Sequence, residues 1–121
     1  MKAWIDALGI SKKDVVYREI EADELAHYSK RTVDIDFKFP FGQDELYGLA
    51  YRTDFDLKQH QEHSKTNMEI TTKDGKKVLP HVVCEPSLGV ERALMVFLLE
   101  SYYHDKEKDS VKLSLNPKLS P

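Results

Sequence analysis

The residues best suited to chemistry are an acid and an arginine that bracket one short stretch, Glu85 and Arg92. Pro86 and Gly89 lie between them and are typical of a tight turn, because proline fixes φ and glycine permits close approach of a ligand to the backbone. We therefore expect a buried strand to end here and a helix to begin after the turn. The unpaired N–H groups of a helix start favour anions. The stretch would hold a cation at Glu85 and a phosphate at Arg92, although the same pattern also occurs in turns without function.

Two aspartate pairs suggest a different kind of chemistry. Asp34 and Asp36, and likewise Asp54 and Asp56, are two positions apart. On a strand each pair would share one face and could perform acid–base work, as in a carboxylate hydrolase. For Asp34 and Asp36 we favour the solvated face of an antiparallel sheet.

A zinc site at His60 and His63 is not favoured. Residues three apart share a helix face, but no third ligand is spaced to join these two imidazoles. The flanking residues, which include Lys58 and Lys65, indicate a polar surface segment instead.

Composition limits the remaining possibilities. A chain of 121 residues that is 40% hydrophobic provides one domain with a modest core. A net charge of −3 gives no overall electrostatic footprint for nucleic acid. The single cysteine, Cys84, excludes an internal disulfide and favours a reducing compartment. The sequence contains neither a membrane-length apolar stretch nor a signal peptide, so we expect a cytoplasmic protein.

Hydrophobic periodicity and turn residues predict the elements that must position these side chains. The clearest strand is 32–39, in which apolar and charged residues alternate, followed by a turn at 40–44 and a hairpin turn at Asp74–Gly75. The strands expected are 15–20, 32–39, 45–51 with a continuation through 52–57, 68–72, 77–84 and 111–115. The helices expected are 1–10, a single turn at 11–14, and 89–103.

Two of these elements are expected to lie inside the protein. The helix 89–103 is apolar on almost every side, which is typical of a buried helix, and the strand 78–84 is nearly continuous in apolar residues. A charged loop is expected at 104–110. The predicted fold class is α+β, with an antiparallel sheet of four to six strands and the helix packed on one face.

Three stretches of the chain resemble, in the same order, one family: the dimeric type of glycyl-tRNA synthetase, which is a class II aminoacyl-tRNA synthetase. The stretches are residues 26–35, 45–57 and 80–93. The last contains both the general Gly-x-x-Arg of the third class II motif and the Glu-Pro-Ser of glycine enzymes. The resemblance implies a class II core in which residues 1–115 are part of the catalytic domain, with motif three at 80–99. Residues 116–121 would lead toward an anticodon-binding domain.

The resemblance also implies an ATP site. Its residues would be Glu45, Leu46, Gly89, Val90, Glu91 and Arg92. Arg92 would lie against ATP as a catalytic residue, and a planar, permanently charged guanidinium suits phosphate and stacking contacts. Glu45 would hold Mg²⁺ on the phosphates, which fits the preference of this ion for carboxylate oxygen.

The resemblance implies a glycine site next to this ATP site. Its residues would be Glu85, Pro86, Ser87, Leu88 and Gly89. Glu85 would bind the ammonium group, while the close backbone and Ser87 would exclude larger amino acids. Arg52 would be the second catalytic arginine, in contact with the substrate or the adenylate.

The implied reaction converts glycine and ATP to glycyl-adenylate and then transfers glycine to tRNA(Gly), in a homodimeric parent enzyme that is not bound to a membrane. The first and second class II motifs have no candidate in these 121 residues. The chain alone is therefore expected not to complete adenylation. An alternative is a standalone synthetase-like module that binds a nucleotide or a protein without catalysis.

Overall fold

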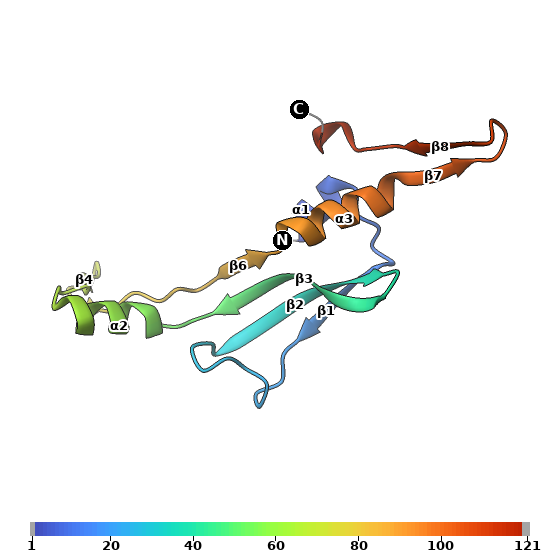
Figure 1. The fold of residues 1–121 in the computed structure, drawn as a ribbon. Coiled ribbons are helices and arrows are strands. Elements are labelled where there is room, and N and C mark those ends of the chain that lie inside the picture. Colours follow the sequence, from blue (N-terminus) through green and yellow to red (C-terminus); the bar gives the residue numbers. More distant parts are fainter. Residues whose placement is uncertain (1, 120–121) are drawn as a thin grey trace. The chain divides into compact units, whose positions relative to one another are not determined.

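A computed structural model describes residues 2–119 (Figure 1). The elements are, in chain order, α1 (Lys2–Leu8), β1 (Val15–Glu19), β2 (Arg31–Phe39), β3 (Gly42–Tyr51), α2 (Phe55–Ser64), β4 (Ile70–Thr71), β5 (Lys77–Val78), β6 (Glu85–Leu88), α3 (Val90–Ser101), β7 (Tyr102–Asp105), β8 (Ser110–Leu113) and a 3₁₀ turn η1 (Pro117–Leu119). This confirms the α+β class. Within the described chain, no helix has the length and apolar character needed to cross a membrane.

The strands form a four-stranded sheet in the order β1-β2-β3-β6 and two separate hairpins, β4–β5 and β7–β8. Strands β2 and β3 are joined by a two-residue turn that Gly42, with a φ of +131°, completes. Both hairpins are antiparallel, with Ile70 opposite Val78 in the first and Tyr102 opposite Leu113 in the second. The hairpin predicted around Asp74–Gly75 is confirmed, although its strands have only two residues each.

The described chain divides into two compact units. The first contains residues 2–17, 35–47 and 88–119, and the second contains 18–34 and 48–87. All buried hydrophobic side chains among residues 2–119 belong to the first unit: Ile5, Ile10, Ile35, Phe37, Phe39, Leu46, Tyr47, Ala93 and Val96. Burial of apolar surface therefore contributes most to the stability of the first unit.

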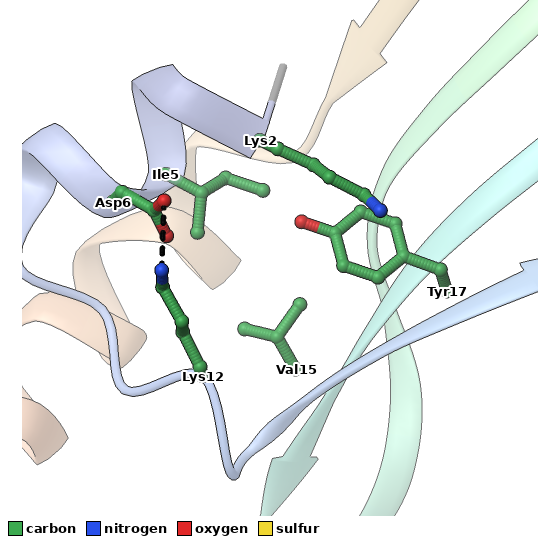
Figure 2. Close-up of a pocket in the computed structure, with 6 residues that line it drawn as sticks. All are labelled: Lys2, Ile5, Asp6, Lys12, Val15 and Tyr17. Atoms are coloured by element: carbon green, nitrogen blue, oxygen red, sulfur yellow. Dashed lines mark ion pairs between the residues drawn. The ribbon is translucent and has the colours of Figure 1, made fainter.

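Helix α1 is confirmed over its described residues. It ends where Gly9 takes a φ of +82°, a conformation that favours glycine. Its Ile5 is buried and faces Val15 across a hollow of about 190 Å³ (Figure 2). The Asp6–Lys12 ion pair of 3.1 Å borders this hollow. The helical turn expected at 11–14 is a single turn, closed by the Asp14 N–H and the Ser11 carbonyl.

The stretch around Pro86 differs from the prediction. Instead of a turn it forms β6, which lies at the edge of the sheet. An edge strand tolerates proline because the missing N–H is on the side without a partner strand. Gly89 has extended backbone, with φ −86° and ψ 114°, so no sharp turn is required before α3.

The central strand predicted at 77–84 was also wrong. Strand β5 ends at Val78, and Val83 and Cys84 are exposed. Pro80 cannot donate to a strand ladder, and beyond it only Val82 makes an isolated bridge, to Thr53. A run of apolar residues therefore passes over the surface.

Helix α3 is shorter and more exposed than expected. It ends at Ser101, and only Ala93, Val96 and Ser101 are buried. The predicted all-round burial was therefore wrong: Leu94 is 58% exposed. The loop expected at 104–110 begins later, because β7 continues directly from the helix to Asp105.

The continuation of β3 through 52–57 was wrong as well. Thr53 has a φ of +56°, which turns the chain out of the strand, and α2 begins at Phe55. Asp54 precedes the helix and forms an ion pair of 2.8 Å with Lys58. Helix α2 could not be predicted from periodicity, because none of its residues is buried and no apolar stripe marks it.

Candidate active site

The second unit contains a cluster of charged side chains around Arg52. The guanidinium donates from Nε and Nη2 to the two oxygens of Asp56, at 2.7 and 2.6 Å. It also donates from Nη1 to Oε2 of Glu85 at 2.9 Å. Paired, charge-assisted bonds of this kind are strong and fix orientation. The Arg52 side chain is only 18% exposed, so solvent screens these contacts less than at an open surface.

An aromatic cluster borders the same arginine. The Arg52 guanidinium carbon lies 4.0 Å from the centroid of the Tyr28 ring, a cation–π contact. The His27 ring lies edge-on against Tyr28 at 5.2 Å and against Phe55 at 5.4 Å. The loop before β2 and the start of α2 therefore both contribute to the surroundings of Arg52.

The end of β3 and the start of α2 place these groups. Arg52 donates its backbone N–H to the Val82 carbonyl, and Val82 donates to the Thr53 carbonyl. This bridge holds Thr53 in a left-handed conformation that a β-branched residue rarely adopts. The resulting bend brings Asp56, four residues after Arg52, within reach of its guanidinium.

The Arg52–Asp56 pair predicts a pH dependence of stability. The hydrogen bonds from Arg52 lower the pKa of Asp56 below its ordinary value, so the pair stabilises the fold at neutral pH and the stabilisation is lost as acid protonates Asp56. Asp56→Asn should lower the melting temperature at pH 7, and the difference should shrink as the pH falls through the lowered pKa of Asp56 and vanish in strong acid. Melting followed by circular dichroism checks this.

Asp23→Asn is the matched control, because Asp23 is exposed and has no ion pair among residues 2–119. A difference between Asp56→Asn and the unsubstituted chain that persists unchanged into strong acid would contradict the role of the pair.

The first unit contains the other predicted arginine. Arg92, in the first turn of α3, forms an ion pair of 2.9 Å with Asp44 and also donates to the backbone carbonyl of Glu45. Both side chains are nearly half exposed. An exposed pair of this kind contributes about 0–1 kcal/mol, so a stronger anion can displace Asp44 at little cost.

The other predicted ATP-site residues differ in exposure. The Glu45 side chain is exposed at the start of β3, whereas Leu46 is buried at 1% exposure. Any contact of Leu46 with a nucleotide would therefore be made by its backbone. Val90 and Glu91 are exposed in the first turn of α3. A Cβ added at Gly89 would touch only the Arg92 side chain, at an ordinary 3.6 Å.

The predicted glycine-site residues lie along β6. Glu85 is half-buried, and Pro86, Ser87 and Leu88 are exposed. Their strand passes from the second unit to the first between Ser87 and Leu88. The structure thus brings Arg52 and Glu85 together, and separately Arg92 and Asp44.

The aspartate pairs do not resemble an acid–base site. Asp34 and Asp36 are buried, not solvated as predicted, because Arg18 and Gln43 supply hydrogen bonds of 3.0 and 2.9 Å. Asp54 and Asp56 each pair with a cation that lowers the pKa of the carboxyl. Such permanently ionised groups are poor proton donors near neutral pH. In the described part of the chain, no group of three His, Cys, Asp or Glu side chains is arranged to hold a metal ion.

Sequence reasoning missed Tyr28, Asp44 and Asp56 as partners of the two arginines. Asp56 is four residues from Arg52, the spacing of helical ion pairs, and this signal was available once a helix had been placed there. Tyr28 and Asp44 are 24 and 48 residues from their arginines in the chain, so only the folded chain identifies them.

No protein-family model matches the chain. Among curated proteins, the glycine--tRNA ligase of Alkaliphilus metalliredigens is 44% identical over 126 aligned positions, covering 99% of this chain and 27% of the relative. The enzymes of Staphylococcus saprophyticus and Caldanaerobacter subterraneus subsp. tengcongensis are 43% and 39% identical over 98% of this chain and 26% of each relative. The chain spans about a quarter of the length of these curated relatives.

Over nearly its whole length, this α+β chain with two carboxylate-bound arginines is similar to one segment of these aminoacyl-tRNA ligases. These relatives are glycine--tRNA ligases, and the chain is similar to about a quarter of each. This confirms the resemblance of the three motifs and favours a ligase segment over a standalone binding module.

Proposed function

We propose that residues 1–115 form the motif-three part of a class II catalytic domain and that 116–121 lead toward an anticodon-binding domain. In the whole, homodimeric enzyme, glycine and ATP would give glycyl-adenylate and pyrophosphate, and the glycyl group would pass to tRNA(Gly). The observation that carries this proposal is the identity of 39–44% to glycine--tRNA ligases over at least 98% of the chain.

Glu85 is the proposed group for the glycine ammonium. Its Oε2 atom accepts a hydrogen bond from Arg52, and its side chain keeps 44% exposure, so a ligand can reach it. Because glycine has no side chain for the site to contact, its affinity must come from its two charged ends. Pro86, Ser87, Leu88 and Gly89 would limit the space for any larger amino acid.

Arg92 is the proposed group for ATP, together with Glu45, Leu46, Gly89, Val90 and Glu91. In the free chain its guanidinium is paired with Asp44. A triphosphate carries several negative charges and offers bidentate acceptors, so it competes well for this arginine. Binding of ATP would replace the exposed carboxylate of Asp44, as the partner of Arg92, by the more highly charged triphosphate.

The donor chemistry at Glu45 fits Mg²⁺. The Glu45 side chain is exposed, and Arg92 engages the carboxylate of the neighbouring Asp44. Mg²⁺ usually takes one or two carboxylates together with substrate phosphates. When bound, the ion would neutralise charge on the phosphates.

The chemistry requires no covalent intermediate on the protein. The glycine carboxylate would attack the α-phosphorus of ATP, forming the adenylate P–O bond as the bond to pyrophosphate breaks. The residues of this chain would contribute by orienting glycine at Glu85 and by stabilising phosphate charge at Arg92.

A hybrid enzyme tests this proposal. The chain would replace the matching quarter of the Alkaliphilus metalliredigens ligase, and glycine-dependent pyrophosphate exchange would be measured. We expect exchange by the hybrid and none by the 121-residue chain alone, because the chain lacks donors for the α-phosphate. A correctly folded hybrid without exchange, or strong exchange by the chain alone, would contradict the proposal.

A further inference from the structure

We propose that Arg52 acts on glycine through Glu85 rather than by touching the substrate, and that Tyr28 and Asp56 are positioning residues that fix Arg52. The proposal rests on the proposed function, since it concerns the ammonium site assigned to Glu85. It replaces the direct contact of Arg52 with substrate that the resemblance implied.

The donors of Arg52 are already in use. Its Nε and Nη2 atoms donate to Asp56, and its Nη1 atom donates to Glu85. One face of the guanidinium is covered by the Tyr28 ring. A guanidinium held on two edges and one face has little freedom to turn toward a substrate.

The carboxylate of Glu85, unlike the guanidinium of Arg52, is only partly occupied by protein partners. Only its Oε2 atom accepts a hydrogen bond from the described residues, and that bond comes from Arg52. The other carboxylate oxygen, Oε1, has no protein partner within residues 2–119, and the side chain is 44% exposed. Arg52 thus fixes one oxygen of Glu85 and leaves the other to accept from a ligand.

The charges of the cluster also suit a single ammonium group. Two carboxylates and one guanidinium leave a net charge of −1 on Asp56, Glu85 and Arg52. Without Asp56, the guanidinium would neutralise Glu85 and weaken its attraction for a cation. Asp56 therefore lets Arg52 orient Glu85 without cancelling its charge. The ligand class is a small primary ammonium compound.

Tyr28 contributes its ring and not its hydroxyl group. The ring centroid lies 4.0 Å from the guanidinium carbon, and the hydroxyl makes no hydrogen bond with the described residues. His27 and Phe55, with centroids 5.2 and 6.5 Å from that of Tyr28, hold the ring in place. Tyr28→Phe should therefore preserve the cation–π contact with Arg52, whereas Tyr28→Leu should abolish it.

The first test uses the hybrid enzyme. Tyr28→Leu is expected to raise the KM for glycine about tenfold while the KM for ATP and kcat stay within about twofold. Tyr28→Phe should restore the original KM. Equal changes in both KM values, no change in the KM for glycine, or failure of phenylalanine to rescue would overturn the positioning role.

The second test uses the 121-residue chain and does not depend on activity. In ¹H–¹⁵N spectra, the ring current of Tyr28 should displace the Arg52 side-chain resonances upfield, and Tyr28→Leu should abolish the displacement while Tyr28→Phe keeps it. Absence of the displacement would overturn the proposal. An inactive, folded hybrid whose Arg52 resonances are displaced would instead count against the proposed function alone.

Discussion

Arg92→Lys is expected to lower glycine-dependent pyrophosphate exchange by the hybrid enzyme about 100- to 1,000-fold, the usual loss when one preorganised donor to developing charge is removed. Lysine keeps the positive charge but not the planar fork that binds a phosphate through two parallel hydrogen bonds. The loss should appear mainly in kcat, because the interaction is strongest in the transition state.

Arg31→Lys is the matched control for this substitution. Arg31 also makes a two-point ion pair with Glu19, at 2.7 and 3.1 Å, and both side chains of the pair are exposed. It has no proposed contact with substrate, so exchange should stay within about twofold. Equal losses in the two variants would show that Arg92 has only a structural role.

Leu46→Ala is expected to destabilise the chain by about 2–5 kcal/mol, because it removes a fully buried side chain and leaves a cavity. Leu46 is 1% exposed and belongs to the apolar core of the first unit. For a domain of ordinary stability this is a large share of the folding free energy. Urea denaturation followed by tryptophan fluorescence measures it, with Trp4 as the probe.

Leu113→Ala makes the same chemical change at a side chain that is 53% exposed. It should alter the free energy of unfolding by less than about 1 kcal/mol. If the two variants were equally stable, Leu46 would not be part of the core that the structure assigns.

The sequence predicted the elements that have a clear residue periodicity or typical turn residues. Strand β2 alternates apolar and charged residues, and the turn that follows it contains Pro40 and Gly42, so both were correctly placed. Strand β6 was missed because proline usually ends a ladder, and its presence depends on the strand lying at an edge, which sequence does not reveal. Helix α2 has no buried face, so periodicity had nothing to detect.

Burial was harder to predict than secondary structure. The apolar character of α3 is visible in the sequence, but what covers a helix is not, and half of the residues of this one are exposed. Asp34 and Asp36 were predicted to face solvent, yet hydrogen bonds from Arg18 and Gln43 allow their burial. The same holds for the site: Glu85 and Arg52 were both identified from the motifs, whereas their contact across 33 positions was not.

The concentration of buried apolar side chains in the first unit has a consequence for how the second unit responds to its surroundings. Contacts between charges weaken as ionic strength rises, while apolar packing does not. Dissolved salt should therefore weaken the exposed ion pairs of the second unit more than it weakens the apolar core of the first.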